Sequence, residues 1–150
     1  MTTADDFAVL WPSPSPKAYL SRRYHLSASH RLHCDTFTAD QNRDAYGKCN
    51  NPHGHGHNYV VEVLVGGPVA AETGMVLNLV DVDAAVENRV MRRFDHTNLN
   101  LDPLFVNRVP TTENLCKAIF ELLHGAFEPA ALEQVRVEET ENNFFEYSGA

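Results

Sequence analysis

The segment 49–59, which reads CNNPHGHGHNY, gathers histidine, glycine and one cysteine in an unusual density. His55 and His57 lead directly into VVEVLV at 60–65, a β-branched run that predicts a buried strand. Side chains alternate between the two faces of a strand, so His55 and His57 fall on the same face. Two imidazoles placed in this way can bind one metal ion.

A metal site in this segment needs a third ligand, and His30 is available at the end of another strand-like stretch. Three histidine ligands without cysteine are typical of a catalytic zinc ion with an open fourth position. Gly54 and Gly56 carry no side chain and allow the backbone to approach a neighbour closely. The alternative is a histidine-rich loop that reflects composition alone, since the chain has eight histidines in 150 residues.

Length and charge limit the class of protein. A chain of 150 residues is expected to form one domain with a real core. Its net charge of −8 argues against nucleic acid and anionic membranes as partners, although a few local cations can still bind a small anion. The odd cysteine count (Cys34, Cys49 and Cys116) argues against a disulfide framework. With no membrane-length apolar run and no signal-peptide pattern, we expect a soluble, cytoplasmic protein.

The first half of the chain predicts strands joined by a polar connection. Alternating proline and serine in residues 1–17 predict a flexible arm, which leaves residues 18–150 as a single domain. The stretch 17–30 alternates like a strand. Residues 31–48 are polar and predict a long loop, and the glycines and proline at 66–68 predict a turn.

The second half predicts two helices and a closing hairpin. Apolar residues recur every four positions in the first helix, at Val82, Val86, Val90 and Phe94. A polar loop follows at 95–100. A second helix begins after Pro110, with Thr111 or Thr112 as its cap, buries Cys116, Ile119, Leu123 and Phe127, and stops at Pro129. Strands at 135–139 and 144–147 form the hairpin. This order predicts an α+β fold in which an antiparallel four-stranded sheet carries two helices on one face.

Six short strings in this chain resemble the 6-pyruvoyltetrahydropterin synthase family and occur in that family's order. They are SASHRL at 27–32, the segment 49–59, GMV at 74–76, DH at 95–96, PTTENL at 110–115 and ET at 139–140. Each string alone is weak, whereas six together are specific. The resemblance covers the chain from about Tyr24 to its end.

The resemblance implies a fold, an assembly and a reaction. The fold is the tunnelling-fold unit, in which trimers close their sheets into a barrel and two trimers stack into a homohexamer. The reaction belongs to tetrahydrobiopterin biosynthesis: a zinc-dependent carbon–oxygen lyase converts 7,8-dihydroneopterin triphosphate to 6-pyruvoyltetrahydropterin and releases triphosphate.

The resemblance also assigns roles to individual residues. It implies zinc ligands at His30, His55 and His57, and proton transfer by Cys49, Asp95 and His96. It implies that Glu139 anchors the pterin ring and places Thr111 and Thr112 close to that ring. From the residues alone, however, Asp95 and His96 fit better as the end of a helix, where histidine is favoured, and the threonines fit as ordinary caps.

The proposed chemistry calls for such groups on independent grounds. Zinc can lower the pKa of a bound oxygen to roughly 7, which acidifies a substrate hydroxyl. A thiol near a cation becomes a base at neutral pH, as removal of a carbon-bound proton requires. A carboxylate at Glu139 can accept two parallel hydrogen bonds from a pterin edge. Cys34 and Cys116 are more typical of packing positions.

Three points stay open from the sequence. Cys49 precedes a His-Gly-His by three residues if His53 is used and by five if His57 is used. We prefer the five-residue frame because it places the ligand pair against the strand, whereas the three-residue frame resembles the related 6-carboxytetrahydropterin synthases of deazapurine (queuosine) biosynthesis. A non-catalytic zinc- or pterin-binding protein is a further alternative. No basic string marks a triphosphate site, for which the candidates are Arg22, Arg23, Arg31 and Lys48.

Overall fold

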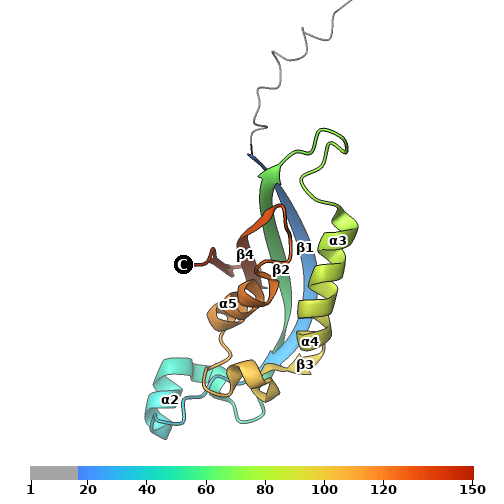
Figure 1. Cartoon of the computed structure of the whole chain (residues 1–150). Helices are drawn as coiled ribbons and strands as arrows, with labels where there is room; N and C mark the ends of the chain where they lie inside the picture. The colour runs from blue at the N-terminus through green and yellow to red at the C-terminus, as the bar shows by residue number, and fades with distance from the viewer. Residues whose placement is uncertain (1–16) are drawn as a thin grey trace, which may run out of the picture.

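A curved sheet forms the centre of the structure (Figure 1). The computed structural model describes residues 17–150, so the predicted arm lies, except for Lys17, outside the described residues. The strands follow the order β3-β1-β2-β4-β5 across the sheet. Their bounds are β1 Lys17–His30, β2 His55–Pro68, β3 Thr97–Asn98, β4 Ala131–Thr140 and β5 Asn143–Tyr147. The α+β class predicted from the sequence is therefore confirmed.

The prediction of a purely antiparallel four-stranded sheet is wrong in one respect, because β3 adds a fifth strand that runs parallel to β1. β3 has two residues and lies within the segment 95–100, which we expected to be a loop. Two residues are too few to produce a recognisable alternation. The pairing begins where the His96 N–H donates to the Ser27 carbonyl over 2.6 Å.

Strands β1 and β2 pair along their whole length, from Lys17 opposite Pro68 to His30 opposite His55. The turn predicted at 66–68 is therefore wrong, since these residues continue β2. A Cβ at Gly66 would lie 2.7 Å from the Lys17 side chain, and one at Gly67 would lie 3.1 Å from the backbone of Ala130. Both glycines thus make room for close packing and do not turn the chain.

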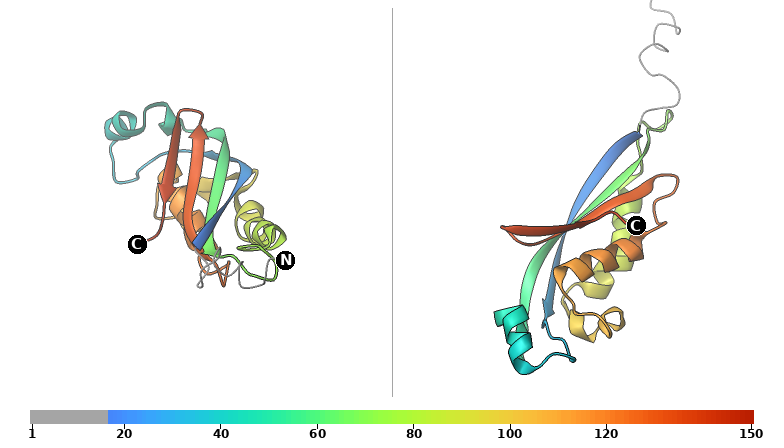
Figure 2. Two further views of the ribbon diagram at one scale, coloured as in Figure 1. Left: turned by 90° about the horizontal axis from the view of Figure 1, so that it is seen from above. Right: turned by 90° about the vertical axis from the view of Figure 1, so that its left-hand side faces the viewer.

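Two helical segments cover one face of the sheet (Figure 2). The first comprises α3 Leu79–Val86, a π-helical segment Glu87–Met91 and α4 Arg92–Phe94. Val82, Val86, Val90 and Phe94 are fully buried, as predicted. An α-helix has 3.6 residues per turn, so a strict spacing of four drifts away from one face. The wider π-helical turn corrects this drift and keeps all four side chains in the core.

The second helical segment is α5 Thr112–Leu123, which begins where the sequence predicts. The Thr111 side chain accepts a hydrogen bond from the Asn114 N–H and so forms the N-cap. The helix ends at Leu123 and not near Pro129 as expected, although Phe127 remains buried beyond its end. None of the described helices is long and apolar enough to cross a membrane.

The connection 31–48 is partly helical, which the sequence reading missed. It contains α2 Ala39–Tyr46, followed by a 3₁₀ turn Gly47–Asn50. Thr38 and Gln41 form a capping box at the start of α2. Buried Asn42 holds the preceding turn through hydrogen bonds with the backbone of Cys34, Phe37 and Thr38. A polar helix held by such bonds has no apolar periodicity to reveal it.

Candidate metal centre and surrounding pocket

Three histidine side chains meet at one end of the β1–β2 ladder. His30 is the last residue of β1 and lies opposite His55, and His57 lies opposite Ala28. The His30 ring centroid is 4.6 Å from that of His55 and 5.1 Å from that of His57. One ring nitrogen of each lies within 4.8 Å of the others. The structure thus groups the three predicted ligands, while His53 is exposed and outside the group.

The carbonyl of Pro110 fixes the orientation of His30. Its oxygen lies 2.7 Å from His30 Nδ1, which must donate the hydrogen bond because a carbonyl can only accept. His30 Nε2 is then the ring nitrogen left with a free lone pair, and it lies 3.1 Å from His55 Nε2. A metal-binding histidine usually donates its other ring N–H to a carboxylate, a backbone carbonyl or water, and here the Pro110 carbonyl accepts it. Sequence reasoning missed it because a backbone carbonyl leaves no mark in the residue pattern.

The electrostatics of the group fit a metal ion. Burial lowers the pKa of His30 and of His57, so both are neutral at pH 7, the form that binds a metal. His57 Nε2 is buried and has no hydrogen-bond partner among residues 17–150, a costly arrangement unless a ligand satisfies it. Two nitrogens on one tetrahedral zinc ion lie about 3.3 Å apart, close to the spacing between His30 and His55. The donor set therefore fits a metal that prefers nitrogen ligands.

Gly54 allows the turn before β2 to pass directly over His30. Its φ is +69°, and a Cβ there would lie 2.7 Å from the His30 carbonyl oxygen. At Gly56 an added Cβ would lie 3.5 Å from the nearest atom, an ordinary contact. Of the two glycines singled out in the sequence, only Gly54 is required by the backbone.

We expect Gly54→Ala to destabilise the protein by about 1–3 kcal/mol, through its positive φ and its collision with the backbone of His30. The displaced His30 should also weaken metal retention. Gly56→Ala is the matched control and should stay within about 1 kcal/mol of the parent. Urea unfolding and metal content measure both effects, and equal stability of the two variants would contradict this reading.

A carboxylate lies beside the histidines. Glu139 Oε1 is 3.6 Å from His57 Nε2 and 4.0 Å from His30 Nε2. It accepts a hydrogen bond of 2.6 Å from the Thr112 hydroxyl, and its other oxygen accepts one from Asn143. Burial opposes ionisation of Glu139, but the hydrogen bonds from Thr112 and Asn143 outweigh it and lower its pKa.

A strand irregularity helps to place Glu139. The register of β4 against β5 shifts between Glu138 and Thr140, a bulge of the kind often found next to functional sites. Glu139 keeps the inward direction of Val137, which is fully buried. The helix cap Thr111 positions the start of α5, and the next residue, buried Thr112, makes the contact with Glu139.

Tyr59 packs against the histidines, a contact that the sequence did not predict. It is fully buried, and its hydroxyl lies 3.4 Å from His30 Nδ1. Burial raises the Tyr59 pKa, and the negative charge of Glu139 raises it further. Cys49 is half-buried in the 3₁₀ turn Gly47–Asn50.

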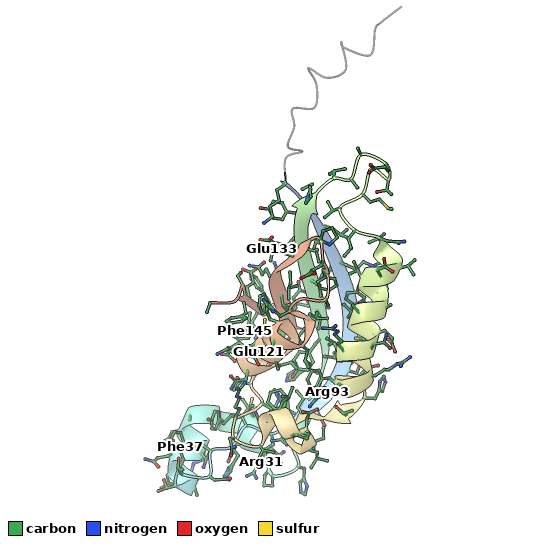
Figure 3. The ribbon with its side chains drawn as sticks, viewed as in Figure 1. Arg31, Phe37, Arg93, Glu121, Glu133 and Phe145 are labelled. Carbon is green, nitrogen blue, oxygen red and sulfur yellow. The ribbon has the colours of Figure 1, made fainter. Side chains whose placement is uncertain are left out.

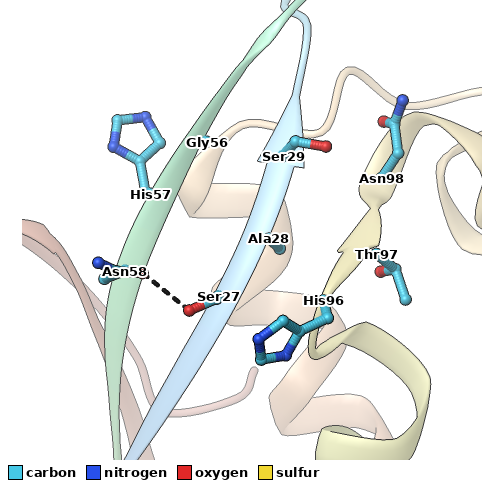
Figure 4. Close-up of a pocket in the computed structure, with 9 residues that line it drawn as sticks. All are labelled: Ser27, Ala28, Ser29, Gly56, His57, Asn58, His96, Thr97 and Asn98. Atoms are coloured by element: carbon cyan, nitrogen blue, oxygen red, sulfur yellow. Dashed lines mark hydrogen bonds between the residues drawn. The ribbon is translucent and has the colours of Figure 1, made fainter.

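His96 lies beside the edge of β1 that faces β3 (Figure 4), and Asp95 precedes it in the chain. The Asp95 carboxylate accepts the Ser27 N–H over 2.9 Å and lies 2.9 Å from His96 Nδ1. Burial opposes ionisation of Asp95, but the Ser27 and His96 hydrogen bonds outweigh it and lower its pKa. β1 separates His96 from His57 on β2, and two strand spacings amount to about 10 Å. The His96 side chain is 81% exposed. Across β1 from the histidine group, His96 borders a hollow of about 420 Å³ that His57 also lines.

The other two cysteines differ in character. Cys116 is buried, with its Sγ 3.2 Å from the Val135 carbonyl, and burial raises its pKa to about 12. It is an unreactive packing residue. Cys34 is half-buried, and a hydrogen bond from Thr36 lowers its pKa.

Comparisons with known proteins agree with this geometry. Residues 19–150 match the family model described as 6-pyruvoyl tetrahydropterin synthase. The chain is 44% identical over 139 residues to the 6-pyruvoyl tetrahydrobiopterin synthase of Drosophila melanogaster, covering 91% of this chain and 83% of the relative. It is 44% identical over 134 residues to the Homo sapiens protein of that name, covering 89% and 92%. The solved structure of Caenorhabditis elegans 6-pyruvoyl tetrahydropterin synthase superposes with a TM-score of 0.85 at 38% identity, covering 90% of this chain and 97% of that one. The chain therefore belongs to the 6-pyruvoyl tetrahydropterin synthase family.

Proposed function

We propose that this protein converts 7,8-dihydroneopterin triphosphate to 6-pyruvoyltetrahydropterin and releases triphosphate. The observation that carries the proposal is the position of Glu139, whose carboxylate lies 3.6 Å from His57 within the histidine group. A carboxylate that can accept hydrogen bonds from a pterin edge thus lies beside three nitrogen donors that can hold a metal. Family membership supports the same reaction.

The metal that we assign is zinc, with His30, His55 and His57 as its ligands. When bound, zinc acidifies a hydroxyl of the substrate side chain. The chain prepares the ligands in advance: Pro110 orients His30, and burial keeps His30 and His57 neutral. Three ligands leave room for a fourth from the substrate.

Glu139 anchors the pterin ring in this proposal. Its lowered pKa keeps it ionised at neutral pH, and Thr112 and Asn143 hold it from two sides. Each carboxylate oxygen has further lone pairs and can accept an N–H from the pterin edge. Thr112 therefore positions the anchor, and Thr111 caps the helix that carries Thr112.

Cys49 removes the carbon-bound proton, because a thiolate is the strongest base that this part of the chain can supply near neutral pH. Asp95 and His96 relay protons as a hydrogen-bonded pair. Since His96 is exposed at the β1 edge, we propose that it acts on the pocket of a neighbouring copy. The active unit is then an oligomer.

The sheet edges support assembly. β1 pairs with β3 only at Ala28 and Ser29, so residues 17–26 have no strand on that side within the described chain. β5 forms the other edge. Open edges are normally covered or paired, and copies of the same sheet can do both.

We expect a symmetric homohexamer, a dimer of trimers, at micromolar concentration. Light scattering coupled to size exclusion measures the mass directly, with a chain mass of 16.8 kDa as the unit. A stable monomer that retains full turnover would contradict both the assembly and the role of His96 in a neighbouring pocket.

Identification of the product by mass tests the reaction. The purified protein is incubated with 7,8-dihydroneopterin triphosphate in the presence of zinc. Formation of 6-pyruvoyltetrahydropterin supports the proposal, whereas a 6-carboxy product would identify the deazapurine-pathway activity. Binding of the pterin without turnover would indicate a non-catalytic protein on the same fold.

A further inference from the structure

Most basic side chains of this protein are already neutralised. All twelve lysines and arginines lie within the described residues. Eight of them have a carboxylate oxygen within 4.0 Å, among them the triphosphate candidates Arg22, which pairs with Asp83, and Arg23, which pairs with Glu138. Four have none within the described residues, namely Arg31, Lys48, Arg89 and Lys117.

Two of these four cations are sequence neighbours of residues of the proposed site. Arg31 directly follows His30, and Lys48 directly precedes Cys49. The other two have structural contacts away from it: Arg89 donates to the Leu122 carbonyl, and Lys117 lies over the Tyr147 ring. The sequence candidates for a triphosphate site are therefore reduced to Arg31 and Lys48.

Arg31 is held in place from three directions. The Asn100 side chain bonds both to its N–H, over 2.6 Å, and to its carbonyl, over 2.8 Å. Its Nε donates to the Asn50 carbonyl over 3.2 Å. Neither Nη nitrogen has a hydrogen bond or ion pair with any described residue. Figure 3 shows Arg31 at the end of the molecule that carries α2.

A fixed guanidinium with both Nη groups free is suited to an anion. Its planar fork matches the oxygens of phosphate in a bidentate manner, and a fork that is already positioned loses little entropy on binding. Arg31 and His30 both line a hollow of about 220 Å³. In a protein of net charge −8, such local cations must attract a polyphosphate against the overall field.

We propose that Arg31 binds the triphosphate group of the substrate and that Lys48 contributes a second, more mobile charge. The identity of the ligand as the substrate's own triphosphate rests on the proposed function. The polyphosphate site itself does not, because inorganic tripolyphosphate can be tested without any turnover.

Titration calorimetry with inorganic tripolyphosphate tests the site on the full chain. We expect Arg31→Gln to weaken binding by about 10- to 100-fold, since hydrogen bonds to a charged group are lost. Lys48→Gln should weaken it by about 3-fold, as an exposed charge does. Lys117→Gln removes the same charge from a distant unpaired cation and is the matched control, expected to stay within about 2-fold.

Neopterin, which lacks phosphates, separates anion binding from folding. Arg31→Gln should bind neopterin as the parent does, and Arg31→Lys should recover part of the tripolyphosphate affinity. Absence of tripolyphosphate binding in the parent, full affinity in Arg31→Gln, or an equal loss in Lys117→Gln would each overturn the proposal. A selective loss in Arg31→Gln together with no turnover by the parent would retain the anion site and refute the proposed reaction.

Discussion

Replacing His57 with alanine is expected to remove the bound metal and, with it, turnover. His57 is one of three nitrogen donors grouped at the end of the β1–β2 ladder, and a site reduced to two ligands binds zinc far more weakly. Loss of even an outer-shell partner costs about 10- to 100-fold in metal affinity, so loss of a ligand should exceed 100-fold. Metal content by atomic absorption, after dialysis against a weak chelator, gives a readout that does not depend on activity.

His53→Ala provides the matched control for this experiment. His53 belongs to the same His-Gly-His pattern but is exposed and outside the group. We expect this variant to keep about one zinc per chain and near-normal turnover. Full zinc in His57→Ala, combined with loss in His53→Ala, would show that the three-residue frame from Cys49 is correct.

The long elements follow from local patterns in the sequence. Alternation over 17–30 predicts β1 with its observed bounds, because fourteen residues with one buried face leave little freedom of register. The cap at Thr111 gives the start of α5 in the same way. Elements without an apolar pattern were missed: α2 is mostly polar and β3 has two residues. Contacts to distant or backbone groups hold both α2 and β3 in place. A local pattern of residue types does not reveal such contacts.

The residues of the candidate site likewise differ in whether a local sequence pattern could predict their position. Strand alternation places His55 and His57 on one face, and the antiparallel β1–β2 ladder brings His30 opposite His55. The neighbours of this group depend on tertiary packing. The Pro110 carbonyl, the contact of Tyr59 with His30 and the contact between Thr112 and Glu139 join segments separated by 27 to 80 residues.

The sequence could not show where Asp95 and His96 lie relative to the other residues of the candidate site. The motif DH at 95–96 reads as part of the same chemistry as Cys49. In the structure it is docked on the opposite edge of β1, and His96 is exposed with a φ of +59°. A non-glycine residue in this conformation is uncommon and is held here by the bond from its N–H to Ser27. In the proposed mechanism its role depends on assembly, which local patterns in one chain do not show.

Cys49→Ala is expected to lose about 10²–10⁴ in turnover while keeping the fold, the zinc and the pterin affinity. The reason is that different residues are expected to bind the metal, bind the pterin ring and remove the proton. In the proposed site the histidines hold the metal and Glu139 binds the ring, so loss of the thiol would leave both binding contacts in place. Cys49→Ser should be almost as slow, because a hydroxyl is far less acidic than a thiol and supplies little base at neutral pH.

Cys34→Ala is the matched control, since Cys34 is equally half-buried and its pKa is lowered, but its thiol bonds to Thr36 outside the histidine group. We expect its turnover to stay within a few-fold of the parent. Single-turnover measurements with saturating substrate separate the chemical step from binding.

A parent-like rate in Cys49→Ala would exclude the thiol as the base, and the proton would then have to be taken by the Asp95–His96 pair of a neighbouring copy. In that case His96→Ala, and not Cys49→Ala, should show the large loss in rate.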